Sequence, residues 1–357
     1  MRGLRKRKIV HRKLFTNSGS VFLYRIRAME GNASDNTSVY KPAPICSNVD
    51  TLMKRYYLPA MYSTIFIVGL LGNLFAITVY LVKMRPWKSS SIIMFNLVVT
   101  DFLYMLSLPF LVYYYTNGDS WTMGDFMCRF VRFAFHFNLY GSILFLTSLS
   151  VFRYVAIVYP YRAQQVQKKR WGILICTIVW ATAAVAITPM TTMISLIESQ
   201  NVTQCLDFAS NDLETVWWYS WLLTVLGFLM PLATVCMCYF SIVRALSTGP
   251  HTQSECRIKA RRHVVLIIVV FVLCFLPFHI SRAIRVETRR PSFDCLVMRR
   301  AHAAYIFFRP IAGLHTFFNL ALNTTAGDQF QKACSELFNC FRCESKRKEV
   351  CNVAVIS

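Results

Sequence analysis

Seven blocks of predominantly apolar residues constrain the fold of this chain more than any other feature. They cover residues 58–81, 92–115, 126–158, 171–193, 217–245, 264–284 and 301–322. A helix of about 20 residues, rising 1.5 Å per residue, crosses the roughly 30 Å hydrocarbon core of a bilayer. Backbone groups in lipid must be satisfied internally, and the roughly ten-residue alternation of a membrane barrel is absent. The sequence therefore predicts an all-α bundle of seven transmembrane helices.

The composition agrees with a membrane protein. Of 357 residues, 55% are hydrophobic and only 16% are charged, which excludes a disordered chain and disfavours a soluble globule. The net charge of +22 would suggest nucleic-acid binding in a soluble protein. Read segment by segment, however, much of it lies in the connections between the apolar blocks, so we expect the lipid bilayer as a partner and no nucleic acid.

These basic connections orient the bundle. The connections after the first, third and fifth blocks are rich in Lys and Arg, whereas the second and fourth contain acidic residues and no Lys or Arg. By the positive-inside rule the basic connections are cytoplasmic. Seven spans then predict an extracellular tail over 1–57, a membrane domain over 58–323 and a cytoplasmic tail over 324–357 that begins with a short amphipathic helix. The sequons at Asn32, Asn36 and Asn201 fall outside, so we expect glycans there.

The first 28 residues oppose this orientation. They hold nine basic residues and no acidic one, which would hinder export of the N-terminus if they were present during insertion. We take Met29 as the physiological start, with the preceding residues as an upstream extension. A genuine basic tail that is exported nonetheless is the alternative.

The last outer connection also departs from the rule, because it is basic although it faces outward. Its five arginines, against Glu287 and Asp294, are Arg285, Arg289, Arg290, Arg299 and Arg300. An outward-facing basic loop indicates that something anionic approaches there.

Polar and kink-forming residues mark six of the seven blocks. They are Gly72-Asn73, Asn96 to Asp101, Cys128 with Phe152-Arg153-Tyr154, Trp180, Pro231 with Tyr239, and Phe271 to His279 including Pro277. This set resembles the rhodopsin-like G-protein-coupled receptors, over residues 57–341. The resemblance implies a plasma-membrane receptor with a small-molecule ligand, a heterotrimeric G protein, arrestin and a receptor kinase as partners, and no enzymatic activity. Pro231 and Pro277 remove helix hydrogen bonds and create kinks about which segments can swing.

Buried Asp101 is costly in lipid unless it is hydrated, paired or bound to a cation. The resemblance implies a pocket for sodium and water here, and we expect no other cofactor. The residues that it implies are Asp101, Asn73, Asn138, Ser142 and Asn319. A purely structural polar cluster is the alternative.

The resemblance implies that Arg153, with Tyr239, engages the G protein. An arginine that snorkels to the membrane interface is the alternative for Arg153. Phe152 replaces the acid that pairs with this arginine in most relatives. The segment from Asn319 to Asn323 lacks both the usual proline and the usual tyrosine, and His315 stands where asparagine is commoner. A weakly coupling receptor therefore stays open.

Thirteen cysteines divide by compartment. The resemblance implies a disulfide between Cys128 and Cys205, and Cys46 with Cys295 makes a second candidate pair on the oxidising side. Cys340 and Cys343, which follow the amphipathic segment 330–341, are palmitoylation candidates, with free thiols as the alternative. No cysteine arrangement predicts a metal site.

Three arginines lie at membrane depth near the outer ends of their blocks: Arg132, Arg282 and Arg309. Each costs several kcal/mol there unless it is paired or faces water, and no acidic residue in the outer halves of the helices is placed to neutralise them. His136 and His279 share faces with Arg132 and Arg282, and Tyr115 can supply a phenol. The spacing predicts a standing anion site, since a guanidinium donates two parallel hydrogen bonds to carboxylate or phosphate. Single arginines that snorkel to headgroups are the alternative.

The motif His279-Ile-Ser-Arg282, with Arg132 and Arg309, is similar to the purinergic-like branch that includes receptors for nucleotides and for carboxylic acids such as 2-oxoglutarate and succinate. Residues 84–94, 124–128, 133–140 and 274–280 resemble the dicarboxylate receptors of that branch. The resemblance implies that the cationic set binds a small dicarboxylate such as 2-oxoglutarate or itaconate. It also implies coupling to Gq, with Gi as a second candidate.

The sequence also bears on classes of protein other than a dicarboxylate receptor. A nucleotide or cysteinyl-leukotriene receptor uses similar cations for a larger ligand. A transporter would show a repeat of two halves, and none is visible. No nucleophile with its base predicts an enzyme, and the absence of lysine from the seventh block excludes a retinal photoreceptor.

Overall fold

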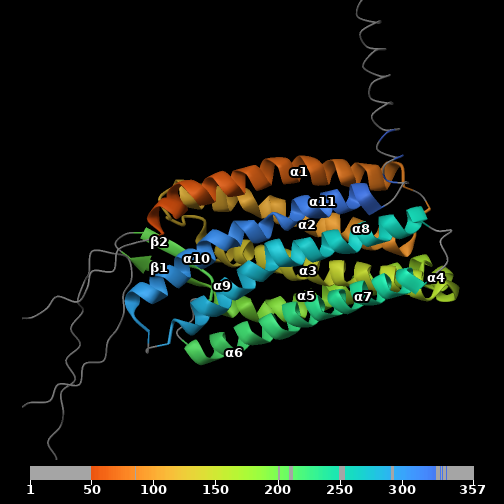
Figure 1. Ribbon diagram of the computed structural model, residues 1–357. Helices are drawn as coiled ribbons and strands as arrows, with labels where there is room; N and C mark the ends of the chain where they lie inside the picture. Colours follow the sequence, from red (N-terminus) through yellow and green to blue (C-terminus); the bar gives the residue numbers. More distant parts are fainter. Residues whose placement is uncertain are drawn as a thin grey trace, which may run out of the picture.

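The computed structural model describes residues 50–84, 86–199, 202–208, 212–248, 254–290 and 293–326, together with Phe330, Lys332 and Ser335. Figure 1 shows long helices packed side by side in one elongated bundle. Several predicted sites lie outside the described residues. These are Asn32, Asn36, Cys46, Asn201, Cys340 and Cys343, with residues 1–49 and most of the amphipathic segment 330–341.

The first half of the bundle consists of five apolar or connecting helices in chain order. They are α1 (Leu58–Val82), preceded by the π-helical turn η1 (Met53–Tyr57), α2 (Ser89–Thr116), α3 (Gly124–Val158), α4 (Pro160–Val166) and α5 (Lys169–Ile187), which continues into the 3₁₀ turn η2 (Thr188–Met193). A hairpin of β1 (Ser195–Ser199) and antiparallel β2 (Val202–Leu206) follows, with Leu196 opposite Cys205. We call the end of the bundle that carries this hairpin the hairpin end (Figure 1).

The fifth and sixth predicted blocks each form two helices joined by a π-helical turn. The fifth comprises α6 (Leu213–Thr224), η3 (Val225–Leu229) and α7 (Met230–Thr248), and the sixth comprises α8 (Ser254–Val270), η5 (Phe271–Phe275) and α9 (Leu276–Glu287). Both turns end within two residues of the proline that the sequence marked as a kink, Pro231 or Pro277. Wide turns of this kind and prolines are the usual causes of bends in long helices.

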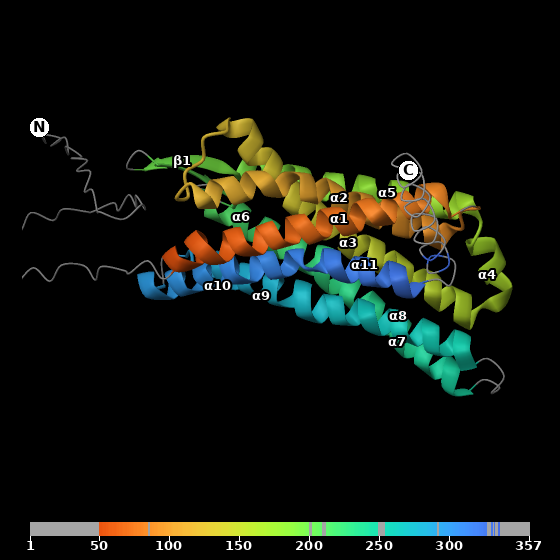
Figure 2. The ribbon, with the colours of Figure 1, turned by 90° about the horizontal axis from the view of Figure 1, so that it is seen from above.

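The seventh block is helical but divided, unlike the continuous span that the sequence predicts. It consists of α10 (Cys295–Gly313) and α11 (His315–Ala326), which run beside α1 in Figure 2. Pro310 cannot donate a backbone hydrogen bond and Gly313 is a poor helix former, so the helix ends there and restarts after Leu314. Within the described part of the chain, six helices are long and apolar enough to cross a membrane, and this divided one is not among them.

The exterior of the bundle is apolar and its interior is partly polar. Large apolar side chains such as Leu71, Trp218 and Phe240 are exposed on the outer surface, whereas Asp101, Asn138 and other polar groups are buried between the helices. This inversion is expected of a protein whose surface meets lipid.

One disulfide fixes the hairpin to the bundle. Cys128 near the start of α3 is bonded to Cys205 in β2, with Cα atoms 5.8 Å apart, which confirms the implied pair. Cys295 is also disulfide-bonded, while Cys46, its predicted partner, lies outside the described residues. The hairpin is further held by the Trp121 backbone N–H, which donates to the Thr203 carbonyl at 2.7 Å.

Candidate functional site

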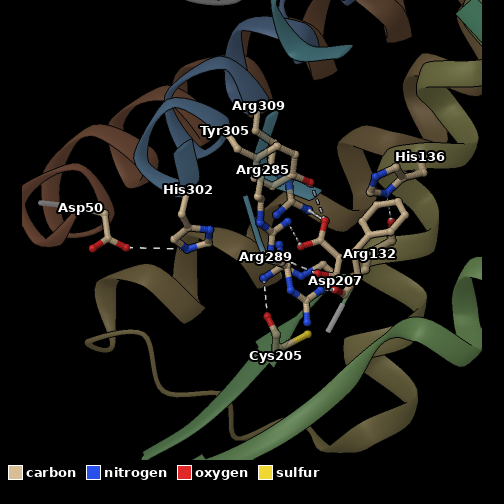
Figure 3. Close-up of polar contacts among 11 residues, drawn as sticks. Asp50, Arg132, His136, Cys205, Asp207, Arg285, Arg289, His302, Tyr305 and Arg309 are labelled. Atoms are coloured by element: carbon tan, nitrogen blue, oxygen red, sulfur yellow. Dashed lines mark hydrogen bonds and ion pairs between the residues drawn. The ribbon is translucent and has the colours of Figure 1, made fainter. Parts of the chain in front are cut away.

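A buried carboxylate, Asp207, lies at the centre of the cationic cluster at the hairpin end. Tyr305 Oη donates to Asp207 Oδ2 at 2.7 Å. Arg285 Nη1 lies 3.8 Å from Oδ1, and Arg309 Nη2 lies 3.8 Å from Oδ2. Figure 3 shows Asp207 between these side chains and Arg132 of α3. We call the set Asp207, Arg132, Arg285, Tyr305 and Arg309 the Asp207 cage.

The disulfide explains how a loop residue reaches this position. Asp207 follows Cys205 by two residues, and Arg132 follows Cys128 by four, so the Cys128–Cys205 bond brings both toward the same place. Arg132 Nη2 donates to the Cys205 carbonyl at 2.6 Å, which ties the arginine to the strand itself.

The chain after Asp207 is held in an unfavourable conformation. Phe208 has φ 52°, in the left-handed region that residues other than glycine rarely adopt. Arg285 Nη2 donates to the Asp207 carbonyl at 3.3 Å, and Arg289 donates to the Phe208 carbonyl. Burial, reinforced by the charge of Arg285, lowers the pKa of Arg289 to about 10, so it remains charged at neutral pH. These contacts fix the loop and point the Phe208 ring into the bundle, where it is buried.

The electrostatics of the cage favour anions. Burial would raise the pKa of Asp207, but the charges of Arg309, Arg132 and Arg285 outweigh it and hold this pKa well below its usual value. Three guanidinium groups face one carboxylate, which leaves two positive charges in excess. Buried donors of the three arginines lack hydrogen-bond partners: Arg132 Nε and Nη1, Arg285 Nη1, and Arg309 Nε and Nη2. Such donors are costly unless an acceptor reaches them.

Aromatic rings form the walls of the cage. The guanidinium carbon of Arg285 lies 4.5 Å from the Tyr305 ring centre, and that of Arg309 lies 4.9 Å from the centre of Phe135. Arg132 lies 5.9 Å from the Tyr114 ring. These contacts hold the cations in place without neutralising their charge.

Arg282 occupies a separate position one turn deeper along α9, which we call the Arg282 niche. It donates to Tyr140 Oη, to Thr224 Oγ1 at 2.9 Å and to the Ser220 carbonyl at 3.4 Å. His279 lies beside it, with its ring stacked on Phe228 at 4.2 Å and Nδ1 bonded to the Phe275 carbonyl at 2.8 Å.

His136 and Phe208 lie between the cage and the niche. His136 Nδ1 is 3.0 Å from the Arg132 carbonyl, and because a carbonyl can only accept, the proton is on Nδ1. Its Nε2 is buried without a partner. The His136 ring lies 5.5 Å from that of Phe208, and Arg282 lies 5.9 Å from the same phenylalanine ring.

The structure brings together only part of the predicted ligand set. Arg132 and Arg309 meet in the cage, while Arg282 and His279 lie in the niche. Tyr115 is buried and stacked on Tyr62, with ring centres 6.0 Å apart. The sequence-based expectation concerned acidic residues of the helices only, whereas the acidic partner of the arginines, Asp207, reaches them from the end of the hairpin.

Sequence reasoning missed Asp207, Arg285 as a cage member, Tyr305 and Tyr140. For Asp207 a signal existed, because a residue two positions after a disulfide-bonded cysteine must lie near the helix that carries the other cysteine. For Tyr305 and Tyr140 we find no local signal, since their contacts depend on how the helices are rotated.

The polar set around Asp101 is brought together in part. Asn138 Nδ2 donates to Oδ1 and Asn319 Nδ2 donates to Oδ2, both at 2.9 Å. Ser142 lies 3.1 Å from His315 Nε2. Asn73 instead donates to the Gly69 carbonyl of its own helix at 2.8 Å.

At the opposite end of the bundle, Arg153 and Tyr239 are partly buried on α3 and α7, and Phe152 packs into the core. Asn323, at the position of the missing tyrosine, accepts a hydrogen bond from Tyr80 Oη at 2.6 Å and donates to the Asn319 carbonyl at 2.9 Å. The altered segment is thus bonded to α1.

Comparison with known proteins shows what this chain is similar to. Residues 72–319 match the model of the 7 transmembrane receptor (rhodopsin family). The 2-oxoglutarate receptor 1 of Mus musculus is 46% identical over 318 residues, covering 88% of this chain and 94% of the mouse protein. That of Rattus norvegicus is 47% identical over 310 residues, covering 87% and 92%. Purinoceptor 1 of Mus musculus is 37% identical over 323 residues, covering 88% of this chain and 86% of the mouse protein.

Proposed function

Because the chain belongs to the rhodopsin family of seven-transmembrane, G-protein-coupled receptors, we propose that it is activated by a small dicarboxylate such as 2-oxoglutarate or itaconate. It is a multi-pass plasma-membrane receptor and not an enzyme. In our proposal the hairpin end is extracellular and the Asp207 cage receives the ligand from that side.

The observation that carries the proposal is a carboxylate already held in the cage. Asp207 accepts from Tyr305 and lies within ion-pair distance of Arg285 and Arg309, yet each of the three cage arginines keeps a buried donor that makes no hydrogen bond. The cage therefore has the chemistry for a carboxylate and capacity for one more. A ligand carboxylate would use the unpaired donors of Arg132 and Arg309.

A second carboxylate suits the Arg282 niche. Arg282 Nε is a buried donor without a hydrogen-bond partner. The Nε2 atoms of His136 and His279 also lack partners, but with the proton on Nδ1 they accept, so they suit a hydroxyl group or a water rather than the carboxylate itself. Phe208 contacts both regions, and Phe278 is 5.8 Å from Arg282 and 5.6 Å from Phe135, the ring that packs on Arg309. A small ligand with an acidic group at each end would join the two regions.

A ligand that bridges the Asp207 cage and the Arg282 niche gives a route to activation. Arg132 is on α3, Arg282 on α9 and Arg309 on α10, so a bridging ligand draws three helices together at the hairpin end. The turn η5 and Pro277 form a hinge through which α8 would move at the opposite end, near Arg153. There the G protein would bind, Gq first and Gi as a second candidate, with arrestin and a receptor kinase acting later. The agonist shifts this equilibrium only by its differential affinity for the two states.

A nucleotide receptor is the second candidate, favoured by two observations. The chain is 37% identical to the mouse purinoceptor 1, and the excess of positive charge suits phosphate as well as carboxylate. A cysteinyl-leukotriene receptor needs the same cations, and weak coupling remains an alternative because of Asn323.

A ligand panel separates these candidates. Cells expressing the chain from Met1 or from Met29 receive 2-oxoglutarate, itaconate, ADP and leukotriene E, with calcium release and cAMP measured together. We expect responses to the two dicarboxylates and none to the larger ligands. Responses to ADP alone would replace the proposal by the second candidate. Binding of labelled 2-oxoglutarate to the receptor without a calcium or cAMP signal would indicate weak coupling.

A further inference from the structure

A second buried carboxylate, Asp101, lies in the middle of the bundle with no exposed surface. The sequence resemblance places a sodium ion beside it. We infer that this receptor does not bind sodium there, because His315 and two asparagine amides take the place of the ion. The inference concerns Asp101 alone and is independent of the ligand at the hairpin end.

The orientation of His315 is fixed by the division of the seventh helix. Its Nδ1 lies 2.6 Å from the Ala312 carbonyl, in the last turn of α10, which ends at Gly313. Since a carbonyl can only accept, Nδ1 carries the proton. The ring also packs on Phe275, with centres 5.1 Å apart. Nε2 is therefore directed at the polar cluster and cannot turn away without losing the bond to Ala312.

Nε2 of His315 stands beside the carboxylate itself. It lies 3.6 Å from Asp101 Oδ1 and 3.1 Å from Ser142 Oγ. Hard cations of this class require oxygen ligands, whereas an imidazole nitrogen suits transition metals. The His315 ring thus places a nitrogen atom beside Asp101 where a sodium ion would need an oxygen ligand. The same nitrogen is bonded to the hydroxyl of Ser142, which the resemblance assigns to the sodium pocket.

The two asparagines close the remaining sides. Asn138 and Asn319 each present an amide N–H to one oxygen of Asp101, at 2.9 Å. A carboxylate accepts, so these amides must face it with nitrogen, and their oxygens point elsewhere. The oxygens of Asn73, Asn138 and Asn319 have no protein partner, and they are acceptors to which bound waters can donate. The groups that face the carboxylate are thus two amide N–H donors and the unprotonated Nε2 of His315, which accepts from the Ser142 hydroxyl, and none of these three supplies an oxygen ligand for a cation.

Thermal unfolding of the purified full-length receptor, without agonist, tests the inference. A bound ion stabilises the folded state by mass action, so Tm is compared in sodium chloride and in choline chloride at equal ionic strength. We expect no sodium-specific shift for the wild type. We expect His315→Asn to gain a rise of roughly 2 °C or more, and the double variant with Asp101→Asn to lose that rise.

A sodium-specific rise in the wild type that Asp101→Asn removes would overturn the inference. So would a folded His315→Asn receptor that stays indifferent to sodium, because His315 would then not be what excludes the ion. If His315→Asn fails to fold, His315→Gln replaces it, and the wild-type comparison stands on its own. No arm uses a dicarboxylate, so failure here leaves the proposed function untouched.

Discussion

The Asp207 cage and the Asp101 cluster both bury a carboxylate between α3 and the seventh helix, and they solve that problem in opposite ways. Asp207 faces three arginines and a tyrosine, so positive charge is in excess and donors remain unpaired. Asp101 receives two amide hydrogen bonds and lies beside a histidine, so its partners are close and mostly uncharged. The first arrangement is suited to receiving an anion, and the second to holding helices in register.

The largest expected effect comes from removing a cage arginine. Arg309→Ala removes one of the two arginines within ion-pair distance of Asp207 and deletes donors for a ligand. Truncating one member of a buried charge pair costs about 2–5 kcal/mol, so the EC50 for 2-oxoglutarate should rise at least about 30-fold or the response should vanish. Arg132→Ala should act alike, while Arg129→Ala, which changes a more exposed arginine paired with Asp125, should not. Surface expression is measured in parallel. Full potency in both cage variants would reject the site.

Asp101→Asn tests the second arrangement, the Asp101 cluster. It places an amide group opposite the donors of Asn138 or Asn319 and leaves one of them unsatisfied. The expected cost is about 1–3 kcal/mol in the free energy of unfolding, measured as a lower Tm of the purified receptor. Direct binding of labelled dicarboxylate should change less than threefold. A large loss of binding with unchanged Tm would mean that Asp101 serves the ligand rather than the fold.

Asp207→Asn should increase ligand potency, because it removes the carboxylate that already occupies part of the cage. We expect the EC50 for a dicarboxylate to fall about tenfold, equivalent to about 1.4 kcal/mol. Asp212→Asn, which changes a carboxylate that is bonded to Thr215 and lies outside the cage, is the matched control. If Asp207→Asn instead loses binding while its surface expression is normal, then Asp207 assists the ligand and does not compete with it.

Gly227→Ala should have a smaller effect, through the Arg282 niche. A Cβ at Gly227 would lie 2.6 Å from Cε1 of Tyr140, so the tyrosine ring, whose hydroxyl accepts from Arg282, must shift. We expect a several-fold loss of potency, and a similar loss in Tyr140→Phe, which removes only the hydroxyl. Unchanged dose-response curves for both variants would show that the position of Arg282 does not depend on Tyr140.

The smallest effect is expected from pH. The depressed pKa of Asp207 means that its ion pairs contribute stability above the unfolded-state value of 3.8, and that this contribution is lost only as pH falls through the lower folded-state pKa. The difference in Tm between the wild type and Asp207→Asn should therefore stay constant from about pH 7.5 to about pH 5. A difference that shrinks in this range would contradict an ionised, strongly paired Asp207.

The sequence predicts the parts of this molecule that depend on local pattern. Apolar length sets the helices, and Pro231 and Pro277 mark the bends near η3 and η5. The resemblance also gives the correct disulfide between Cys128 and Cys205. Each of these follows from residues near one another in the chain, or from a pair that the family resemblance implies.

The rest depends on how distant segments meet. Asp207 looks like an ordinary loop charge until the hairpin is placed over α3. Asn73 belongs to the implied pocket by position, yet it bonds to Gly69 of its own helix. The contact of His315 with Asp101 depends on where α10 stops, which follows from Pro310 and Gly313 together with packing. Rotation and register of packed helices are not encoded in any single stretch.

The most direct test of the account is binding of labelled 2-oxoglutarate to membranes that carry the wild type, Arg309→Ala or Arg129→Ala at equal surface expression. The Asp207 cage predicts saturable binding to the wild type and to Arg129→Ala that unlabelled itaconate displaces, and a loss of at least about 30-fold in affinity for Arg309→Ala. Equal affinity in all three receptors would contradict the central claim that the cage at the hairpin end holds the ligand.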